Sequence, residues 1–238
     1  MKRVSSRLVL GLMLVFIVLL SGCFGRERVM VPPKVDLGGA ESIAVIYFEN
    51  YTDQPNIAYD VEEKVAGKLR EYYYVADRGE VERAMAELGL RRGLVPTRDE
   101  ILRLGRMLDV DAIVTGEVGF YFEEVVQNPP HIARLYEDGA KAVWEVVQRS
   151  KAVVNFTGRV LDARTGNIIY TRRAEGESSE FRHTTLSWTK PDEAPSWILI
   201  PSPSKQDLPH VRSRAVSQAG DQFTADLLPT YVWMKVEE

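Results

Sequence analysis

The chain has 238 residues, of which 45% are hydrophobic, enough for one sizeable folded domain with its own core. Its 30 Lys and Arg residues are outnumbered by 34 Asp and Glu residues, which gives a formal net charge of −4 at pH 7. An acidic surface argues against a nucleic-acid partner, because the phosphate backbone repels it. With a single cysteine, no disulfide can form within the chain.

The first 22 residues have the three-part layout of a secretory signal peptide. Basic residues come first, an apolar run follows at 8–20, and the small residues Ser21 and Gly22 end the segment. The alternative is a single uncleaved transmembrane helix, which needs about 20 apolar residues and is therefore longer than this run. Residues 1–22 are predicted to be removed.

The end of this segment, Leu-Ser-Gly-Cys, resembles the lipobox of bacterial lipoproteins. The resemblance implies cleavage between Gly22 and Cys23, diacylation of the Cys23 sulfur, and usually a further acyl chain on the new amine. Each buried methylene contributes about 0.8 kcal/mol, so two or three chains, such as palmitate, would hold the protein in a bilayer almost permanently. Phe24 stands where an aspartate would favour inner-membrane retention. The expected location is the outer membrane, with the protein facing the periplasm.

Acylation of Cys23 would leave the folded part without a thiol, and so without a thiolate nucleophile or a zinc thiolate site. The signal segment holds three basic residues and no acidic ones, so the remainder carries about seven excess negative charges. Residues 23–40 contain two prolines and a Gly-Gly pair with no sustained periodicity. This composition predicts a tether between the anchor and the folded part.

Residues 41–238 are predicted to form one α/β domain, because strand and helix patterns alternate at its start. A nearly continuous apolar run predicts a core strand at 42–48. Apolar residues at helical spacing predict a helix over 57–72. A further strand at 112–118 is expected to pair in parallel with the first one, since helices separate the two.

Two short signals predict further helices between these strands. Asp77 and Thr97 are each followed three residues later by a glutamate, which is typical of a helix N-cap with a reciprocal partner. A short strand is expected just before the first of them, at 73–76. The three consecutive tyrosines at 72–74 are assigned to the end of a helix and this strand.

The second half is predicted to contain two insertions. In the first, at 120–150, the start can prolong the preceding strand, and 132–147 has the apolar spacing of a helix. Two β-rich runs at 151–161 and 168–174 follow, and the Gly-containing turn between them signals an antiparallel hairpin.

The second insertion is predicted at 175–209, where Ser, Pro, Thr and charged residues dominate. Beyond it, apolar residues four apart from Val211 to Leu227 predict a closing amphipathic helix. The predicted fold class is therefore α/β, with a mixed sheet flanked by helices and two insertions after the central strands.

Three sequence motifs of the domain resemble those of the lipoprotein superfamily that contains CsgG, LpoB and the amino-terminal domain of TolB. They are the strand and turn at 43–50, the strand entry at 108–116 and the hairpin turn at 162–166. The resemblance implies a domain that docks on other proteins, has no catalytic residues, and can form homo-oligomers. In CsgG the two insertions become membrane-crossing hairpins of a shared oligomer.

One group of aromatic and aliphatic residues is a candidate partner-binding site. It consists of Trp188, Trp197, Ile198, Leu199 and Ile200, which stand in a proline-rich, polar setting. Such residues either cover their own core or anchor a partner. The sequence leaves both alternatives open.

Catalytic and metal signatures are not found in the sequence. His131, His183 and His210 have no metal-ligand spacing, and no cofactor-binding motif is present. Asp109 and Asp111 are interpreted as solvated carboxylates rather than an acid/base pair.

We therefore expect a non-enzymatic outer-membrane lipoprotein without a cofactor. Its periplasmic domain would bind or help assemble an envelope complex for secretion, export or cell-wall synthesis. The alternative is a CsgG-like oligomeric outer-membrane export pore.

Overall fold

The computed structural model describes residues 26–91, 95–137, 139, 141–189, 192–196 and 200–235. The described chain divides into two compact units, one within residues 35–227 and one that joins residues 26–34 with residues 228–235. No helix among the described residues is long and apolar enough to span a bilayer. The lipobox residues Gly22 and Cys23, and the candidate residues Trp197, Ile198 and Leu199, lie outside the described part.

The larger unit is built on a six-stranded mixed sheet in the order β3-β2-β4-β6-β5, with β7 also paired to β6. Its strands are β2 (Ser42–Asn50), β3 (Tyr74–Val75), β4 (Ala112–Gln127), β5 (His131–Leu135), β6 (Ala142–Asp162) and β7 (Ile168–Trp188). β2 is parallel to β3 and β4, whereas β4, β5 and β7 are antiparallel to β6. The α/β class, the parallel pairing of the first core strands and the hairpin are confirmed.

Four helices are described in this unit: α2 (Ile57–Leu69), α3 (Arg78–Glu87), α4 (Arg98–Leu108) and α5 (Leu208–Thr224). Both predicted N-cap residues are confirmed, and the predicted reciprocal bond is confirmed for Thr97 with Glu100. The Asp77 side chain accepts a hydrogen bond from the backbone of Gly79, and Thr97 with Glu100 forms a complete capping box. These local signals fix where α3 and α4 begin.

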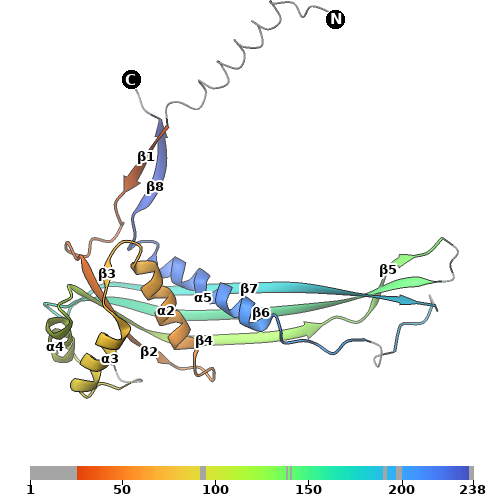
Figure 1. The fold of residues 1–238 in the computed structure, drawn as a ribbon, viewed down its shortest axis with the longest axis horizontal. Coiled ribbons are helices and arrows are strands. Elements are labelled where there is room, and N and C mark those ends of the chain that lie inside the picture. The colour runs from red at the N-terminus through yellow and green to blue at the C-terminus, as the bar shows by residue number, and fades with distance from the viewer. Residues whose placement is uncertain are drawn as a thin grey trace, which may run out of the picture. The chain divides into compact units, whose positions relative to one another are not determined.

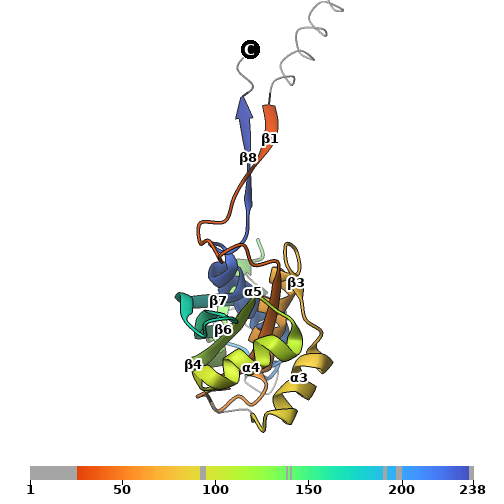
Figure 2. The same ribbon diagram turned by 90° about the vertical axis from the view of Figure 1, so that its left-hand side faces the viewer.

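The helices cover the two faces of the sheet unequally. α2 and α5 pack on each other and on one face, where the rings of Phe48, Phe156 and Phe223 contact one another in tilted and edge-on pairs with centroids 5.8 and 5.6 Å apart. α3 and α4 pack on the opposite face through a buried cluster that includes Ala44 and Ile113. They cover only one end of the sheet, as Figures 1 and 2 show.

Beyond that end, β4, β6 and β7 continue as a sheet extension, which we define as residues 120–127, 142–155 and 175–188 (Figure 1). The helix predicted at 132–147 is therefore wrong, because β5 and β6 occupy this segment. Likewise the first part of the predicted second insertion belongs to β7.

The smaller unit contains an antiparallel two-stranded ribbon of β1 (Arg26–Val31) and β8 (Thr230–Lys235). The segment 23–40, predicted as an irregular tether, thus includes a strand. Its pairing partner lies about 200 residues away in the sequence, so no local pattern could have indicated it.

Candidate docking surface

A β-bulge at Gly119 decides which side chains the sheet extension presents on each face. Up to Val118 the strand alternates in step with β6, and the register shifts between Val118 and Phe120. Because side chains alternate with period two, one extra residue moves every later side chain to the opposite face. Phe120 and Phe122 consequently face away from α5, although Val118 is buried on the α5 side.

The residues between these phenylalanines confirm the change of face. Tyr121 and Glu123 point toward α5, where the Arg212 guanidinium donates to the Tyr121 hydroxyl at 2.8 Å and to the Glu123 carboxylate at 2.8 Å. Burial is the main cause that raises the pKa of Tyr121, to about 12. This contact holds β4 against α5 just beyond the bulge.

The face directed away from α5, which we call the open face, carries exposed apolar side chains from two strands. They are Phe120, Phe122 and Val126 of β4 and Phe181 of β7. Phe181 is 58% exposed and Phe120 is 47% exposed. Exposed apolar residues that gather on one surface are typical of a protein-interaction site.

Three pairs of oppositely charged residues span the strands on the open face. The pairs are Glu117 with Arg159 (3.2 Å), Glu124 with Arg149 (2.8 Å) and Lys151 with Glu177 (2.7 Å). In each pair the two residues are diagonal neighbours, two positions apart in the register of adjacent strands. These six charges are therefore neutralised locally, and exposed phenylalanine and valine side chains lie beside them.

A hollow of about 420 Å³ lies where the open face meets the turn after β2. Tyr51 and Phe120 line it together with Thr157 and Arg173. Tyr51 is exposed, and a hydrogen bond from its hydroxyl to Glu49 raises its pKa, so the phenol keeps its proton. The hollow gives the open face a concave end with aromatic walls.

The opposite face of the extension is covered by the segment that leads into α5. The side-chain amide of Gln148 makes two hydrogen bonds with the backbone of Ser204, at 2.7 and 2.6 Å. Ile200 is buried, so it is not available to a partner in this structure, and Trp188 is half-buried at the far end of β7. The partner-binding role of the Trp188 to Ile200 group stays a prediction.

The outer edge of β7 is partly covered by polar side chains of α5, which bond to its backbone. The pairs are Glu175 N–H with Gln222 (2.6 Å), Glu177 N–H with Gln218 (3.0 Å) and the Ser179 carbonyl with Arg214 (3.2 Å). In a β-strand every second residue directs its N–H and C=O groups to the same edge, so the groups of alternate residues from Phe181 to Ser187 also point outward. Among the described residues no hydrogen bond reaches those N–H groups, so this part of the edge is open.

Two of the three histidines come together at the far end of the extension. His131 Nε2 lies 3.1 Å from one carboxylate oxygen of Glu145, and His183 Nδ1 lies 3.0 Å from the other. The sequence did not indicate this cluster, because His183 comes opposite Val147, next to Glu145 on the same face, only through a register shift between Val160 and Leu161. Within the described part of the chain, no group of His, Cys, Asp or Glu side chains is arranged to hold a metal ion.

The two aspartates that could resemble an acid/base pair have separate structural roles. The Asp111 carboxylate accepts hydrogen bonds from the Glu41 amide (3.0 Å), the Ser42 amide (3.1 Å) and the Ser42 hydroxyl (2.8 Å). The bond from the Glu41 amide, followed by that from the Ser42 hydroxyl, lowers the pKa of Asp111. Asp109 ends α4 in the left-handed conformation, with φ of 51°.

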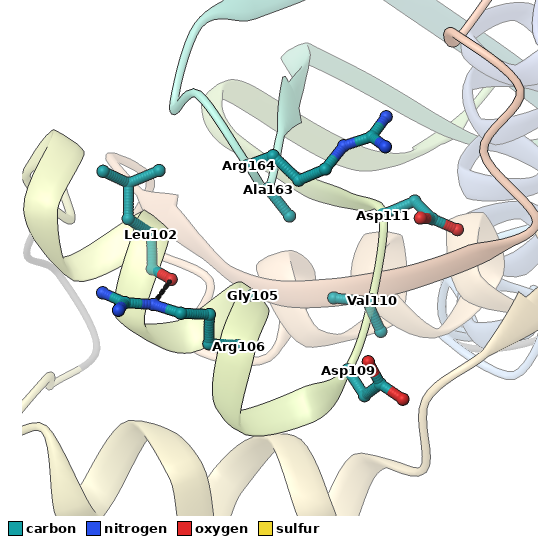
Figure 3. A pocket seen from close by; sticks show the side chains of 8 residues that line it. All are labelled: Leu102, Gly105, Arg106, Asp109, Val110, Asp111, Ala163 and Arg164. Carbon is teal, nitrogen blue, oxygen red and sulfur yellow. Dashed lines mark hydrogen bonds between the residues drawn. The ribbon is translucent and has the colours of Figure 1, made fainter.

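These aspartates border a hollow of about 560 Å³ between α4 and the turn after β6 (Figure 3). The side chains of Arg106 and Arg164 also line it, but Figure 3 shows them extending in different directions. The Arg106 Nε donates to the carbonyl oxygen of Leu102 at 3.1 Å. No set of groups converges on one point, so the geometry provides no catalytic constellation here.

Comparisons with known proteins give structural similarity at low sequence identity. No family model and no curated protein matches the chain. A lipoprotein from Neisseria meningitidis is 19% identical with a TM-score of 0.43, covering 58% of this chain and 83% of its own. A PelC dodecamer from Paraburkholderia phytofirmans is 14% identical with a TM-score of 0.38, covering 85% and 97%.

The LpoB C-terminal domain from Escherichia coli is 14% identical with a TM-score of 0.38, covering 59% of this chain and 85% of its own. LpoB, named above on sequence grounds, is thus among the similar structures, whereas the likeness to CsgG and TolB stays a prediction. Similarity at these scores assigns neither a family nor a function to the chain.

Proposed function

We propose that the protein is a non-enzymatic lipoprotein of the bacterial outer membrane that is acylated on Cys23 and faces the periplasm. Its larger unit binds a protein partner of the envelope through the open face, and so helps to assemble a secretion, export or cell-wall-synthesis complex. The lipobox supports the anchor. The exposed phenylalanines, which stand beside three locally paired sets of charges, support the binding role, and this is the observation that carries the proposal.

The open face is suited to a protein partner because its apolar side chains have no cover of their own. Phe120, Phe122 and Phe181 come from two strands that β6 holds at a fixed spacing. Rigid aromatic side chains that become buried on association contribute strongly to binding. A catalytic role has no comparable support, since the polar groups around the α4 hollow do not converge.

Site-specific photo-crosslinking in intact cells tests the binding role. A photoreactive residue at Phe122 or Phe181 should capture one and the same envelope protein. Tyr74 is similarly exposed but lies on β3, outside the open face, and provides the matched control. Capture of the same protein from Tyr74, or of none from either phenylalanine, would refute the proposed surface.

A second experiment separates binding from folding. Phe122→Ser and Phe181→Ser should reduce capture of the partner at least tenfold, because truncating a buried aromatic anchor costs about 2 kcal/mol or more. Both side chains are exposed in the free protein, so thermal stability should stay close to that of the parent. Mass spectrometry of the purified protein tests acylation of Cys23 directly.

The alternative is an oligomeric export pore resembling CsgG. One observation favours it, since the first insertion consists of strands rather than the predicted helix. The ion pairs of Glu124 with Arg149 and of Lys151 with Glu177 argue against lipid contact on the open face, because charged groups are costly in hydrocarbon. Ring-shaped particles and ion conductance would support the pore. A monomer that stays soluble without detergent after Cys23→Ser would refute it.

A further inference from the structure

The β1–β8 ribbon has one face on which four of six side chains are apolar, with Glu27 at one end of this face and Thr230 at the other. Its register places Val29 opposite Val232, and the neighbouring positions on this face are Val31 and Met234. All four are exposed, from 36% for Val29 to 53% for Met234. We call this the valine face of the ribbon. The four apolar side chains adjoin one another around the central Val29 and Val232 pair, and Glu27 stands beside Met234 at the end nearest Cys23.

The other face of the ribbon combines aromatic and basic groups. The Arg28 guanidinium lies 4.1 Å from the centre of the Tyr231 ring, and Trp233 is opposite Arg28 in the register. Trp233 is 67% exposed. Tryptophan and tyrosine rings beside arginine are typical of the headgroup region of membranes, where an apolar ring meets polar surroundings.

An isolated two-stranded ribbon is only marginally stable in water. The valine face therefore needs a surface to cover it if the ribbon is to persist. The sequence supplies one, because Cys23 stands three residues before Arg26. Three extended residues span about 10 Å, so acyl chains on Cys23 would hold the first residues of β1 within that distance of the bilayer.

We propose that the β1–β8 ribbon lies on the phospholipid surface, with its valine face against the acyl-chain boundary and Arg28 and Trp233 at the level of the headgroups. The proposal rests on the acylation of Cys23 proposed above. Apolar burial drives this contact, so it should be retained on uncharged lipids and at high salt. The ribbon thereby becomes a second membrane contact and restricts the orientation of the anchored chain.

The single cysteine of the chain makes a clean test possible. In an acylated Val232→Cys protein the introduced thiol is the only free one, so it alone takes an environment-sensitive fluorophore. The labelled protein is reconstituted in phosphatidylcholine vesicles. The label should show a blue-shifted emission, lose its quenching by aqueous iodide, and be quenched by lipids that carry a nitroxide near the glycerol.

Two variants serve as comparisons in the same vesicles. A label on Tyr74→Cys, an exposed position of the larger unit, should stay fully quenched by iodide. Adding Val29→Asp beside the Val232→Cys label should restore quenching by iodide, because it places a carboxylate at the centre of the apolar group, whereas the native Glu27 lies at its end. The acyl anchor is unchanged in both.

Three results would overturn the proposal. The label on Val232→Cys could remain as accessible to iodide as the label on Tyr74→Cys. Its protection could disappear when labelled protein is diluted with unlabelled protein, which would show that a second copy covers the valine face. Labelling of two thiols per chain would show that Cys23 is not acylated, and would remove the proposed anchor together with the membrane contact.

Discussion

Replacing Gly176 by alanine should destabilise the larger unit by forcing α5 away from β7. A Cβ atom at this position would lie 1.9 Å from the carbonyl oxygen of Ala215 and 2.8 Å from the amide nitrogen of Ala219. Both atoms belong to the helix backbone, so rotation of a side chain cannot relieve the overlap. Overpacking costs about 1–3 kcal/mol, and the strained hydrogen bonds of α5 to the edge of β7 about 1 kcal/mol more. We expect a total loss of about 2–4 kcal/mol.

The measurement is urea unfolding followed by circular dichroism, in a Cys23→Ser chain that lacks residues 1–22. The matched control is Gly67→Ala on the exposed side of α2, where an added Cβ meets nothing within 4 Å. Removing a glycine from a helix stabilises by about 0.5–1 kcal/mol, so the two substitutions should have opposite signs. If the unfolding free energy of Gly176→Ala stayed within about 0.5 kcal/mol of the parent, the close approach of α5 to β7 would be wrong.

Three further predictions concern single contacts. Asp111→Asn should lower the free energy of unfolding by about 1–2 kcal/mol at neutral pH. Because folding lowers the pKa of Asp111, the stabilisation by its carboxylate is fully present above the unfolded-state pKa of about 3.9 and is lost as the pH falls through the native pKa. Unfolding measured as a function of pH should therefore show the difference between variant and parent shrinking in that acid range. Arg78→Ala should cost about 2–4 kcal/mol by urea unfolding, since it leaves the buried Glu62 without the guanidinium 3.0 Å away, whereas Glu62→Gln should cost less. The double variant Gln218→Ala and Gln222→Ala should expose more of the β7 edge, and sedimentation velocity should then detect association that rises with concentration; a monomer at every concentration would contradict this.

The parts of the fold that were predictable depend on neighbouring residues. The N-caps at Asp77 and Thr97 involve side chains and amides within three positions, so the sequence contains the whole interaction. The first core strand and its parallel partner are short apolar runs buried on both faces. Their pairing follows because the intervening helices carry the chain back to the same edge of the sheet.

The sheet extension was not predictable, because β6 lacks the regular apolar–polar alternation of a strand, and the contacts that compensate for this lie far away in the sequence. On the covered face of β6, apolar Trp144 and Val146 are followed by polar Gln148 and Ser150, so the alternation that marks a strand is interrupted. Gln148 is tolerated there because Ser204, 56 residues away, satisfies its amide. Apolar residues at 143, 144 and 147 meanwhile imitate helical spacing.

The open face was missed for a related reason. Its composition depends on one bulge at Gly119, and nothing in the local sequence states that the strand gains an unpaired residue there. The His131 and His183 contacts with Glu145 likewise depend on the register of three strands. The predicted cluster around Trp188, by contrast, was chosen from composition alone, and the structure buries its member Ile200.

The way α5 lies along β7 limits how much of that strand a helix can shield. Four residues of α5 advance about 6.0 Å along the helix axis, whereas two residues of β7 advance about 6.6 Å along the strand. The axial distance between an α5 side chain and the β7 backbone group that it bonds therefore grows from one pair to the next. The series ends with the pair of Arg214 with Ser179, and one step further, in the first turn of α5, the offset amounts to about 1.8 Å. A longer α5 would therefore not cover the backbone groups along a longer β7. A longer sheet would need another element to cover the outer edge of that strand.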